Sequence, residues 1–544
     1  MQVLFEIFFI FLYFFFHIIK YGLIIRFLGD FMIENKRFFK SGLMLTMVGL
    51  SIRTVGMIFG AFISRTVGAE GTGLYTLVMT VYSFAVTFAT SGISLTVTSL
   101  VASAIGEGRS ERIIGVMRGA ISYAFLFGLG ATVGLFFGAN LIGKYILLDL
   151  RTILALKVLS LSLIPSAMTS VFAGYFVGVK RVSFNATASV FCQAVKILVT
   201  VALVTYLAPR GIVSAVIGLC VGITLTELVG FFVIYLEYLF DTRRFALDKN
   251  SKNGEMKNIS KMALPLAFSA YVRSFLLNIE HILIPKKLRE SGESVTEAYS
   301  HYGSLHGMAL PLVTYPMSPL SSFAGLLVPE FAEDLSAKRK SRMSKIASKA
   351  MNTTLAYGII SAIFLYSFSA ELGYVIYKSY DAGYYISILS FIVPIMYLDH
   401  VTDSMLKGIG EQIFSMWVNI SDSLLSVALV WILIPRMGIL GYAVVILVME
   451  AYNFALSFFR LSRRVSFKIS PFSVILPLFA SVFASKLSDL LFNFGGSGTS
   501  ALWLTLKMLF ALSITVCILA LFSVKKKEIL PQKMKTKKEK RQSF

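Results

Sequence analysis

Charged residues are scarce in this sequence: they make up 15% of its 544 residues, against about a quarter in soluble domains. Only three cysteines occur, which excludes a disulfide framework, and all three (Cys192, Cys220 and Cys517) lie in apolar runs where buried packing is expected. The five histidines show no metal-ligand spacing, and no Walker-type phosphate loop is present. These absences argue against a soluble enzyme, a bound cofactor and direct use of ATP, and the sequence assigns no metal.

Long apolar runs dominate what is present. A membrane-spanning helix needs about 20 mostly apolar residues, and helices are favoured because an open chain in lipid must satisfy its own backbone. We therefore predict an all-α polytopic membrane protein with 14 core transmembrane helices. They are predicted at 41–63, 74–105, 119–142, 153–179, 184–207, 212–239, 262–284, 308–328, 350–369, 384–406, 413–434, 439–459, 474–491 and 501–524.

The basic residues alternate between the two sides of these helices. With the start of the core in the cytoplasm, cytoplasmic connections carry 34 Lys and Arg and the opposite connections carry 9. The positive-inside rule therefore predicts that both ends of the core are cytoplasmic. The same clustering argues that the net charge of +22 serves membrane orientation and attraction to anionic lipids, with no nucleic-acid partner.

An internal repeat divides the core. Val201-Ala-Leu-Val204 followed by Pro209-Arg210 matches Val427-Ala-Leu-Val430 followed by Pro435-Arg436, at an offset of 226 residues. The repeat predicts two parallel six-helix lobes, an N-lobe at 38–245 and a C-lobe at 246–465, as in transporters that bind substrate between their halves. Helices at 466–524 and a basic cytoplasmic tail at 525–544 follow. Residues 1–37 form an apolar extension, read either as an extra helix or as translation from an upstream start.

Three cations lie within predicted helices, where charge is costly and therefore indicates function. Arg53 and Arg273 each lie midway along a first helix of a lobe, 220 residues apart, and Lys196 lies in the fifth helix. The alternative is simple pairing with a carboxylate or a helix end. Because the planar guanidinium fork suits phosphate oxygens, we predict a cationic cavity for a pyrophosphate headgroup.

Carboxylates form a second set within the C-lobe helices: Glu280, Asp399, Asp403 and Asp422. Asp399 and Asp403 are four residues apart and share one helix face. Such carboxylates near the midplane suit Na⁺ or H⁺ coupling, although pairing with the arginines or exposure near a helix end are alternatives.

Several motifs resemble those of a known family. They are IRTVG (52–56), SRTVGAEGTGLY (64–75), SGIS (91–94), YGSLHGMALP (302–311) and YLDHVTDSMLKGIGEQ (397–412). Together they resemble the stage V sporulation protein B group of polysaccharide transporters, in the multidrug/oligosaccharidyl-lipid/polysaccharide exporter superfamily that also contains lipid II flippases. The resemblance spans about residues 38–524. Arg53 matches the family's first-helix arginine, whereas Gly60 stands where a second basic residue is common.

The resemblance implies a plasma-membrane flippase for undecaprenyl-pyrophosphate-linked oligosaccharide, used in cell-wall, spore-cortex or surface-polysaccharide assembly. It implies two lobes in a V shape, with the last two helices forming a groove for the lipid tail. Membrane lipids and wall-synthesis enzymes are the candidate partners, and we expect a monomer. The alternatives are a cation-coupled multidrug exporter of the same fold and a non-transporting scaffold for wall synthesis.

The predicted cavity has a direct test. Arg53→Ala and Arg273→Ala should each abolish transport, because each removes a cation that would hold the anionic headgroup, and membrane abundance should not change. Transport by purified, reconstituted variants measures this, with immunoblots of the membranes as the abundance control. Normal transport by both variants would show that the cationic cavity does not exist.

Overall fold

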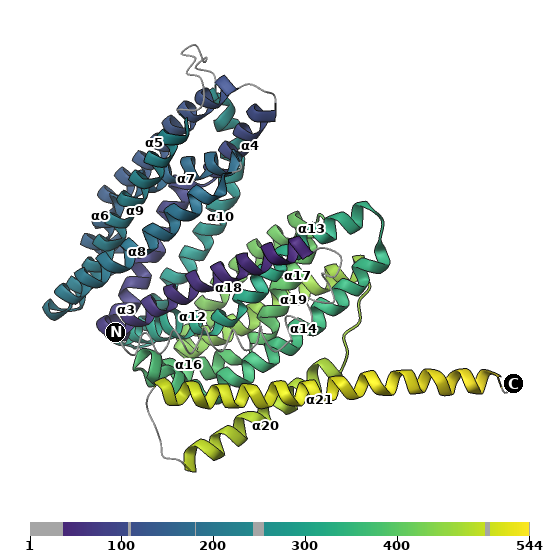
Figure 1. Cartoon of the computed structure of the whole chain (residues 1–544). Coiled ribbons are helices and arrows are strands. Elements are labelled where there is room, and N and C mark those ends of the chain that lie inside the picture. Colours follow the sequence, from purple (N-terminus) through teal and green to yellow (C-terminus); the bar gives the residue numbers. More distant parts are fainter. Residues whose placement is uncertain (1–35, 107–109, 180, 243–254, 495–500, 543–544) are drawn as a thin grey trace. The chain divides into compact units, whose positions relative to one another are not determined.

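The computed structural model describes residues 36–106, 110–179, 181–242, 255–494 and 501–542 (Figure 1). These residues form helices joined by short connections, with no strand among them. Residues 1–35, which hold most of the apolar N-terminal extension, lie outside the described part of the chain. The all-α fold predicted from the apolar runs is confirmed.

The helices fall into two compact units, each described here by itself. The second unit contains residues 63–303 and 423–442, and the first unit contains the described parts of Met1–Phe62, Ser304–Asp422 and Ala443–Phe544. Segment 255–303 thus packs with the N-terminal half, although the repeat assigns it to the C-lobe. The predicted lobes rest on the repeat and not on contacts, so their boundaries stay a prediction.

The helices up to the middle of the chain are α3 (Lys36–Thr90), α4 (Ile93–Gly106), α5 (Ser110–Leu141), the π-helical turn η1 (Ile142–Ile146), α6 (Thr152–Ser160), α7 (Leu163–Gly178), α8 (Val182–Leu207), η2 (Ala208–Arg210), α9 (Ile212–Thr242), α10 (Glu255–Glu290) and α11 (Val295–Tyr302). The remaining helices are η3 (Gly303–Ala309), α12 (Leu310–Thr314), η4 (Tyr315–Met317), α13 (Ser318–Ser336), α14 (Lys340–Ser367), α15 (Ser369–Leu372), η5 (Gly373–Tyr377), α16 (Tyr380–Ser390), α17 (Val393–Gly408), α18 (Gln412–Met437), α19 (Ile439–Arg464), α20 (Phe472–Phe494) and α21 (Ala501–Gln542).

Nine helices in the described residues are long and apolar enough to cross a membrane, or up to eleven when two bent pairs each count as one span. The segments predicted at 262–284 and 308–328 are not among them. The first lies in α10, which carries Arg273 and Glu280, and the second is divided among short helices by Pro311 and Pro316. The chain is a multi-pass membrane protein, and the number fourteen stays a prediction.

The predicted helix at 74–105 is in fact two helices. α3 ends at Thr90 and α4 begins at Ile93, with Gly92 between them at φ 77°. A Cβ atom at Gly92 would lie 2.4 Å from the carbonyl oxygen of Ala263, so only glycine allows α10 to approach this turn. The turn between the first two predicted helices is a kink within α3 at Gly68, which has φ 72°.

The structure repeats in the same order as the sequence. η1, α6 and α7 in the second unit are matched by η5, α16 and α17 in the first unit. Both η1 and η5 are followed by a non-glycine residue in the left-handed region. These residues are Leu148 (φ 55°) after η1 and Lys378 (φ 57°) after η5, and they are 230 positions apart. α6 and α7 meet at a bend of 41°, and α16 and α17 at 59°; Pro165 and Pro394 follow these bends. This shared set of irregularities supports the internal repeat.

A broken helix in lipid leaves backbone carbonyls without their usual helical donors, and side chains supply donors at the α6–α7 break. Thr224 on α9 donates its hydroxyl to the Val158 carbonyl at 3.1 Å. Thr132 on α5 donates to the Ser160 carbonyl at 3.0 Å. The break is therefore fixed by its neighbouring helices.

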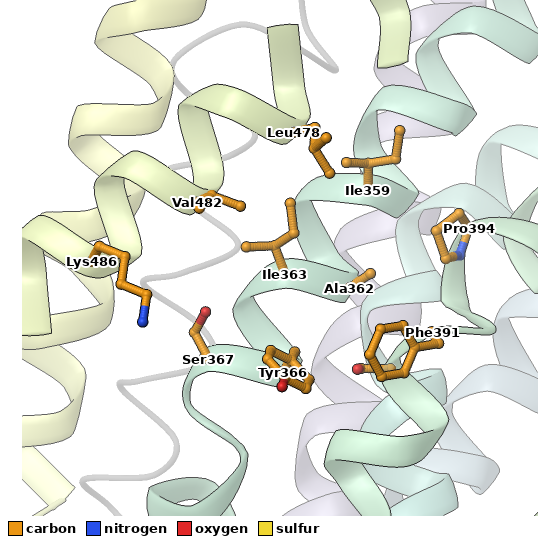
Figure 2. Close-up of a pocket in the computed structure, with 11 residues that line it drawn as sticks. Ile359, Ala362, Ile363, Tyr366, Ser367, Phe391, Pro394, Leu478, Val482 and Lys486 are labelled. Atoms are coloured by element: carbon orange, nitrogen blue, oxygen red, sulfur yellow. The ribbon is translucent and has the colours of Figure 1, made fainter. Parts of the chain in front are cut away.

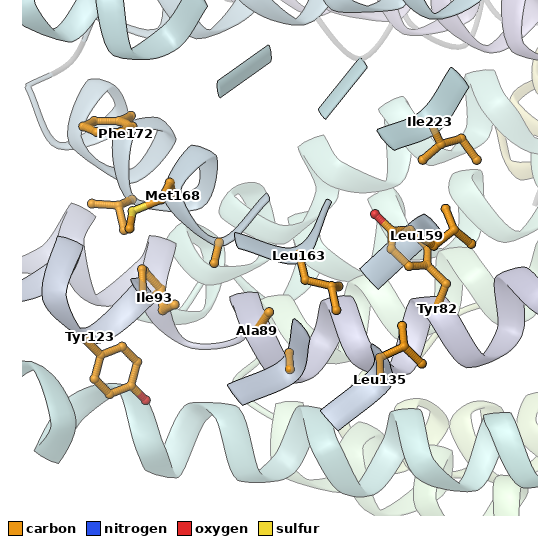
Figure 3. Close-up of a cluster of buried hydrophobic side chains, with 14 of the residues drawn as sticks. Tyr82, Ala89, Ile93, Tyr123, Leu135, Leu159, Leu163, Met168, Phe172 and Ile223 are labelled. Atoms are coloured by element: carbon orange, nitrogen blue, oxygen red, sulfur yellow. The ribbon is translucent and has the colours of Figure 1, made fainter. Parts of the chain in front are cut away.

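The core of the second unit surrounds the same break (Figure 3). The Tyr82 hydroxyl lies 2.7 Å from the Ser162 hydroxyl, which itself donates to the Leu159 carbonyl at 2.6 Å. The side chains of Leu159 and Leu163 are fully buried. A hydrogen-bonded tyrosine within an apolar cluster satisfies its hydroxyl while burying the ring.

An ion-pair network joins α3, α6 and α11 within the second unit. The Arg151 guanidinium donates to Asp149 at 2.8 Å and to Glu70 at 2.8 Å, and it lies over the Tyr299 ring at 5.7 Å. Gly73 allows this approach, because a Cβ atom there would lie 2.0 Å from the Tyr299 carbonyl oxygen. In the motif at 64–75, Gly73 thus packs against α11 and Glu70 takes part in the ion-pair network.

Arg151→Ala should destabilise the second unit, because the Asp149 carboxylate stays buried without its partner. We expect a loss of about 2 kcal/mol, which lies between the effects of breaking an exposed and a fully buried ion pair. The thermal midpoint of this unit should fall by about 4 °C. It can be followed through dye labelling of Cys220, which is fully buried, in a background with Cys192→Ser and Cys517→Ser.

Arg210→Ala is the control, because it removes an exposed guanidinium whose bond is to the Tyr206 hydroxyl and leaves no buried carboxylate. Equal midpoints for Arg151→Ala and the parent protein would show that the network does not stabilise the fold.

Candidate functional site

The three predicted cations occupy different surroundings. Arg273 on α10 is exposed, and in the described part of the chain it forms no hydrogen bond or ion pair. Lys196 on α8 is half-buried and interacts electrostatically with Glu227 on the neighbouring α9. Arg53 lies on α3, and its side chain is outside the described residues. No contact between described residues joins Lys196 to Arg273, so the shared cationic cavity stays a prediction.

The predicted carboxylates divide between the two units. Asp399 and Asp403 on α17 and Asp422 on α18 belong to the first unit, whereas Glu280 on α10 belongs to the second. The grouping of the three aspartates follows from the packing of α17, α18 and α19. The three aspartates and Glu280 are therefore described as two separate groups.

Asp399 and Asp422 interact electrostatically with each other and with Glu450, which lies on α19. Ser457, two turns further along α19, hydrogen-bonds the Asp399 carboxylate. Asp403 also interacts electrostatically with Asp399, but it forms an ion pair with Lys407 at 2.6 Å, so its own charge is already balanced. We call Asp399, Asp422 and Glu450 the carboxylate cluster.

Sequence reasoning missed Glu450. Its signal was present, because it is a single carboxylate inside the apolar run of the predicted helix at 439–459. The sequence could not show that this side chain meets Asp399 and Asp422, which lie 51 and 28 residues away. That proximity is a product of three helices packing together.

Glu280 is buried in the second unit among aromatic residues. Its carboxyl group interacts electrostatically with Tyr302 at the end of α11 and with Tyr442 on α19. Its side chain is 8% exposed. This is a polar site separate from the carboxylate cluster, and it has one carboxylate in place of three.

The motif at 397–412 ends in an ion-pair cluster at one end of the first unit. Glu411 accepts hydrogen bonds from Arg460 at 2.8 Å and from Arg464 at 2.9 Å. The hydrogen bond from Arg460 is the largest cause that holds the pKa of Glu411 below its usual range, with Arg464 adding to it. This part of the motif fixes α17 and α18 to the end of α19.

No group of three or more His, Cys, Asp or Glu in the described part of the chain has the arrangement of a metal site. The carboxylate cluster can hold exchangeable charge, since its members are close enough to influence each other's ionisation. The predicted role of Asp399 and Asp422 in Na⁺ or H⁺ coupling stays a prediction.

Comparison with known proteins places the chain in a family. The family described as "Polysaccharide biosynthesis protein" matches residues 38–335, and the family described as "MatE" matches residues 306–432. Stage V sporulation protein B of Bacillus subtilis (strain 168) is 25% identical over 76% of this chain and 81% of its own length. Sporulation protein YkvU of the same strain is 21% identical over 65% of this chain and 78% of its own.

Solved structures show the same fold. Lipid II flippase MurJ in an inward closed conformation has a TM-score of 0.68 at 13% identity, covering 89% of this chain and 99% of its own. An inward-facing multidrug resistance transporter of the MATE family has a TM-score of 0.63 at 17% identity, covering 77% and 98%.

The chain is therefore a membrane transporter of the multidrug/oligosaccharidyl-lipid/polysaccharide exporter superfamily. Within that superfamily it belongs to the polysaccharide biosynthesis protein family and is similar to stage V sporulation protein B. The resemblance predicted from the motifs is confirmed.

Proposed function

We propose that this protein is a flippase that moves an undecaprenyl-pyrophosphate-linked oligosaccharide across the cytoplasmic membrane by alternating access. The process served would be cell-wall, spore-cortex or surface-polysaccharide assembly. The family match over 38–335 is the observation that carries the proposal, because it covers more than half of the chain. Arg273, exposed on α10, supports an anionic headgroup as the guest.

The two C-terminal helices support a lipid-linked substrate over a soluble drug. The flippase MurJ structure covers 89% of this chain, whereas the MATE transporter covers 77%, and each is itself covered almost completely. The difference between these two shares of this chain, 89% and 77%, corresponds to about 65 residues. That number is similar to the combined length of α20 and α21. We infer that these helices serve a substrate with a long apolar part.

A cation-coupled multidrug exporter is the second candidate, favoured by the MatE match over residues 306–432 and by the TM-score of 0.63. In both cases we place the two ends of the core in the cytoplasm, on the strength of the positive-inside alternation. The protein would act as a monomer, with lipid-linked oligosaccharide and membrane lipids as its partners.

Proteoliposomes test the substrate class. Purified protein should move an undecaprenyl-pyrophosphate-linked sugar between leaflets, measured by the fraction that an added glycan-cleaving or glycan-labelling enzyme reaches. It should not move a cationic dye. Arg436→Ala is the control, because it removes an exposed arginine in the last turn of α18. Movement of the dye and not of the lipid would identify the exporter instead, and movement of neither would favour a scaffold.

We further propose that the carboxylate cluster couples transport to Na⁺ or H⁺. Three carboxylates on three helices are close enough that a bound cation would lower their mutual repulsion. Binding there can change how α17, α18 and α19 pack, which links the ion to a conformational change. Glu280 is a second candidate coupling residue, and Asp403 is a weaker one because of its ion pair with Lys407.

Neutralising the cluster should uncouple transport. Glu450→Gln and Asp399→Asn should each remove the acceleration of transport by an imposed Na⁺ or pH gradient, while Asp381→Asn, an exposed aspartate in the first turn of α16, should keep it. Initial flipping rates in proteoliposomes with and without each gradient measure this. Wild-type rates that ignore both gradients would remove the coupling role entirely.

A further inference from the structure

A groove on the first unit lies between α14, the α16–α17 break and α20, with a volume of about 310 Å³ (Figure 2). Ile359 and Ile363 of α14 and Leu478 and Val482 of α20 line it with apolar side chains. Phe391 and Pro394, at the 59° bend between α16 and α17, border the groove. The lining therefore suits a hydrocarbon chain.

One end of the groove is polar. Figure 2 shows Lys486, Ser367 and Tyr366 at one end, and Leu478 and Ile359 at the other. Lys486 is exposed and, in the described part of the chain, forms no ion pair or hydrogen bond. The groove lining contains no acidic residue.

Lys486 lies within a candidate membrane span. It is six residues before the end of Phe472–Phe492, which is about 9 Å at the rise of an α-helix. Ser367 ends α14, so both residues lie toward the same end of their spans. An unpaired lysine at this depth requires an anionic partner or must reach for the headgroup layer.

We propose that this groove binds one anionic phospholipid of the non-cytoplasmic leaflet. Its phosphate contacts the Lys486 ammonium, and one acyl chain lies against Ile363, Leu478 and Val482. A single lysine matches the single negative charge of a phosphodiester. The pyrophosphate of the proposed substrate carries more charge, so we assign the groove to a resident lipid that braces α20 against α14. The leaflet follows from the proposed orientation of the core, whereas the lipid site itself does not depend on the transported substrate.

Native mass spectrometry of the purified full-length protein tests this, with phosphatidylglycerol and phosphatidylethanolamine as probes. Lys486→Gln should weaken phosphatidylglycerol binding about fivefold, the loss expected for one lysine–phosphate attraction. It should weaken phosphatidylethanolamine binding less, because the ammonium of that lipid already balances its phosphate. Ala362→Phe fills the groove from α14 and should reduce binding of both lipids. Lys144→Gln, which removes an exposed lysine of η1 outside the groove, is the matched control and should change neither.

Equal phosphatidylglycerol binding by Lys486→Gln and the parent protein would overturn the proposal. So would a Lys486-dependent preference for undecaprenyl phosphate over phosphatidylglycerol, because the occupant would then be related to the substrate. If the parent protein binds phosphatidylglycerol but does not flip the lipid-linked sugar, the proposed function is contradicted and the proposed lipid site is not.

Discussion

Backbone hydrogen bonding is the constraint on which the structure depends, because a bilayer provides no water for an unpaired carbonyl. Straight helices satisfy it without help, but in the described residues the pairs α6–α7 and α16–α17 each bend at a break inside a span. At the first break, Thr224 and Thr132 on adjacent helices supply donors to the freed carbonyls. The irregular positions are thus held by neighbours that lie far away in the sequence.

Both breaks lie at matching points of the repeat, and each defines the surroundings of a functional feature. The first is enclosed by the buried core of the second unit (Figure 3). The second borders the groove beside α20 (Figure 2) and leads into α17, which carries Asp399 and Asp403. A duplicated backbone has therefore acquired different side chains in its two copies.

The charges in this membrane protein divide by how they are balanced. Lys507 is buried on α21 and is balanced by Glu371 at 2.9 Å and Asp489 at 2.7 Å, which ties the last two helices to α15. Arg151 and Glu411 are balanced in the same way near helix ends. Arg273 forms no ion pair or hydrogen bond in the described part of the chain, and this contrast makes it a candidate for transport.

The sequence by itself determined the membrane class, most of the spanning segments, the repeat and the family, since each rests on local hydrophobicity, on charge alternation or on motifs. It placed Asp399 and Asp422 correctly within helices, and it recognised that Arg273 is unusual there. Tertiary structure alone decided that Glu450 joins those aspartates, that Glu280 does not share their unit, and that Asp403 is neutralised by Lys407. The physical reason is that helix periodicity shows which face of a helix is polar, whereas the partner of that face depends on packing between segments that are distant in the sequence.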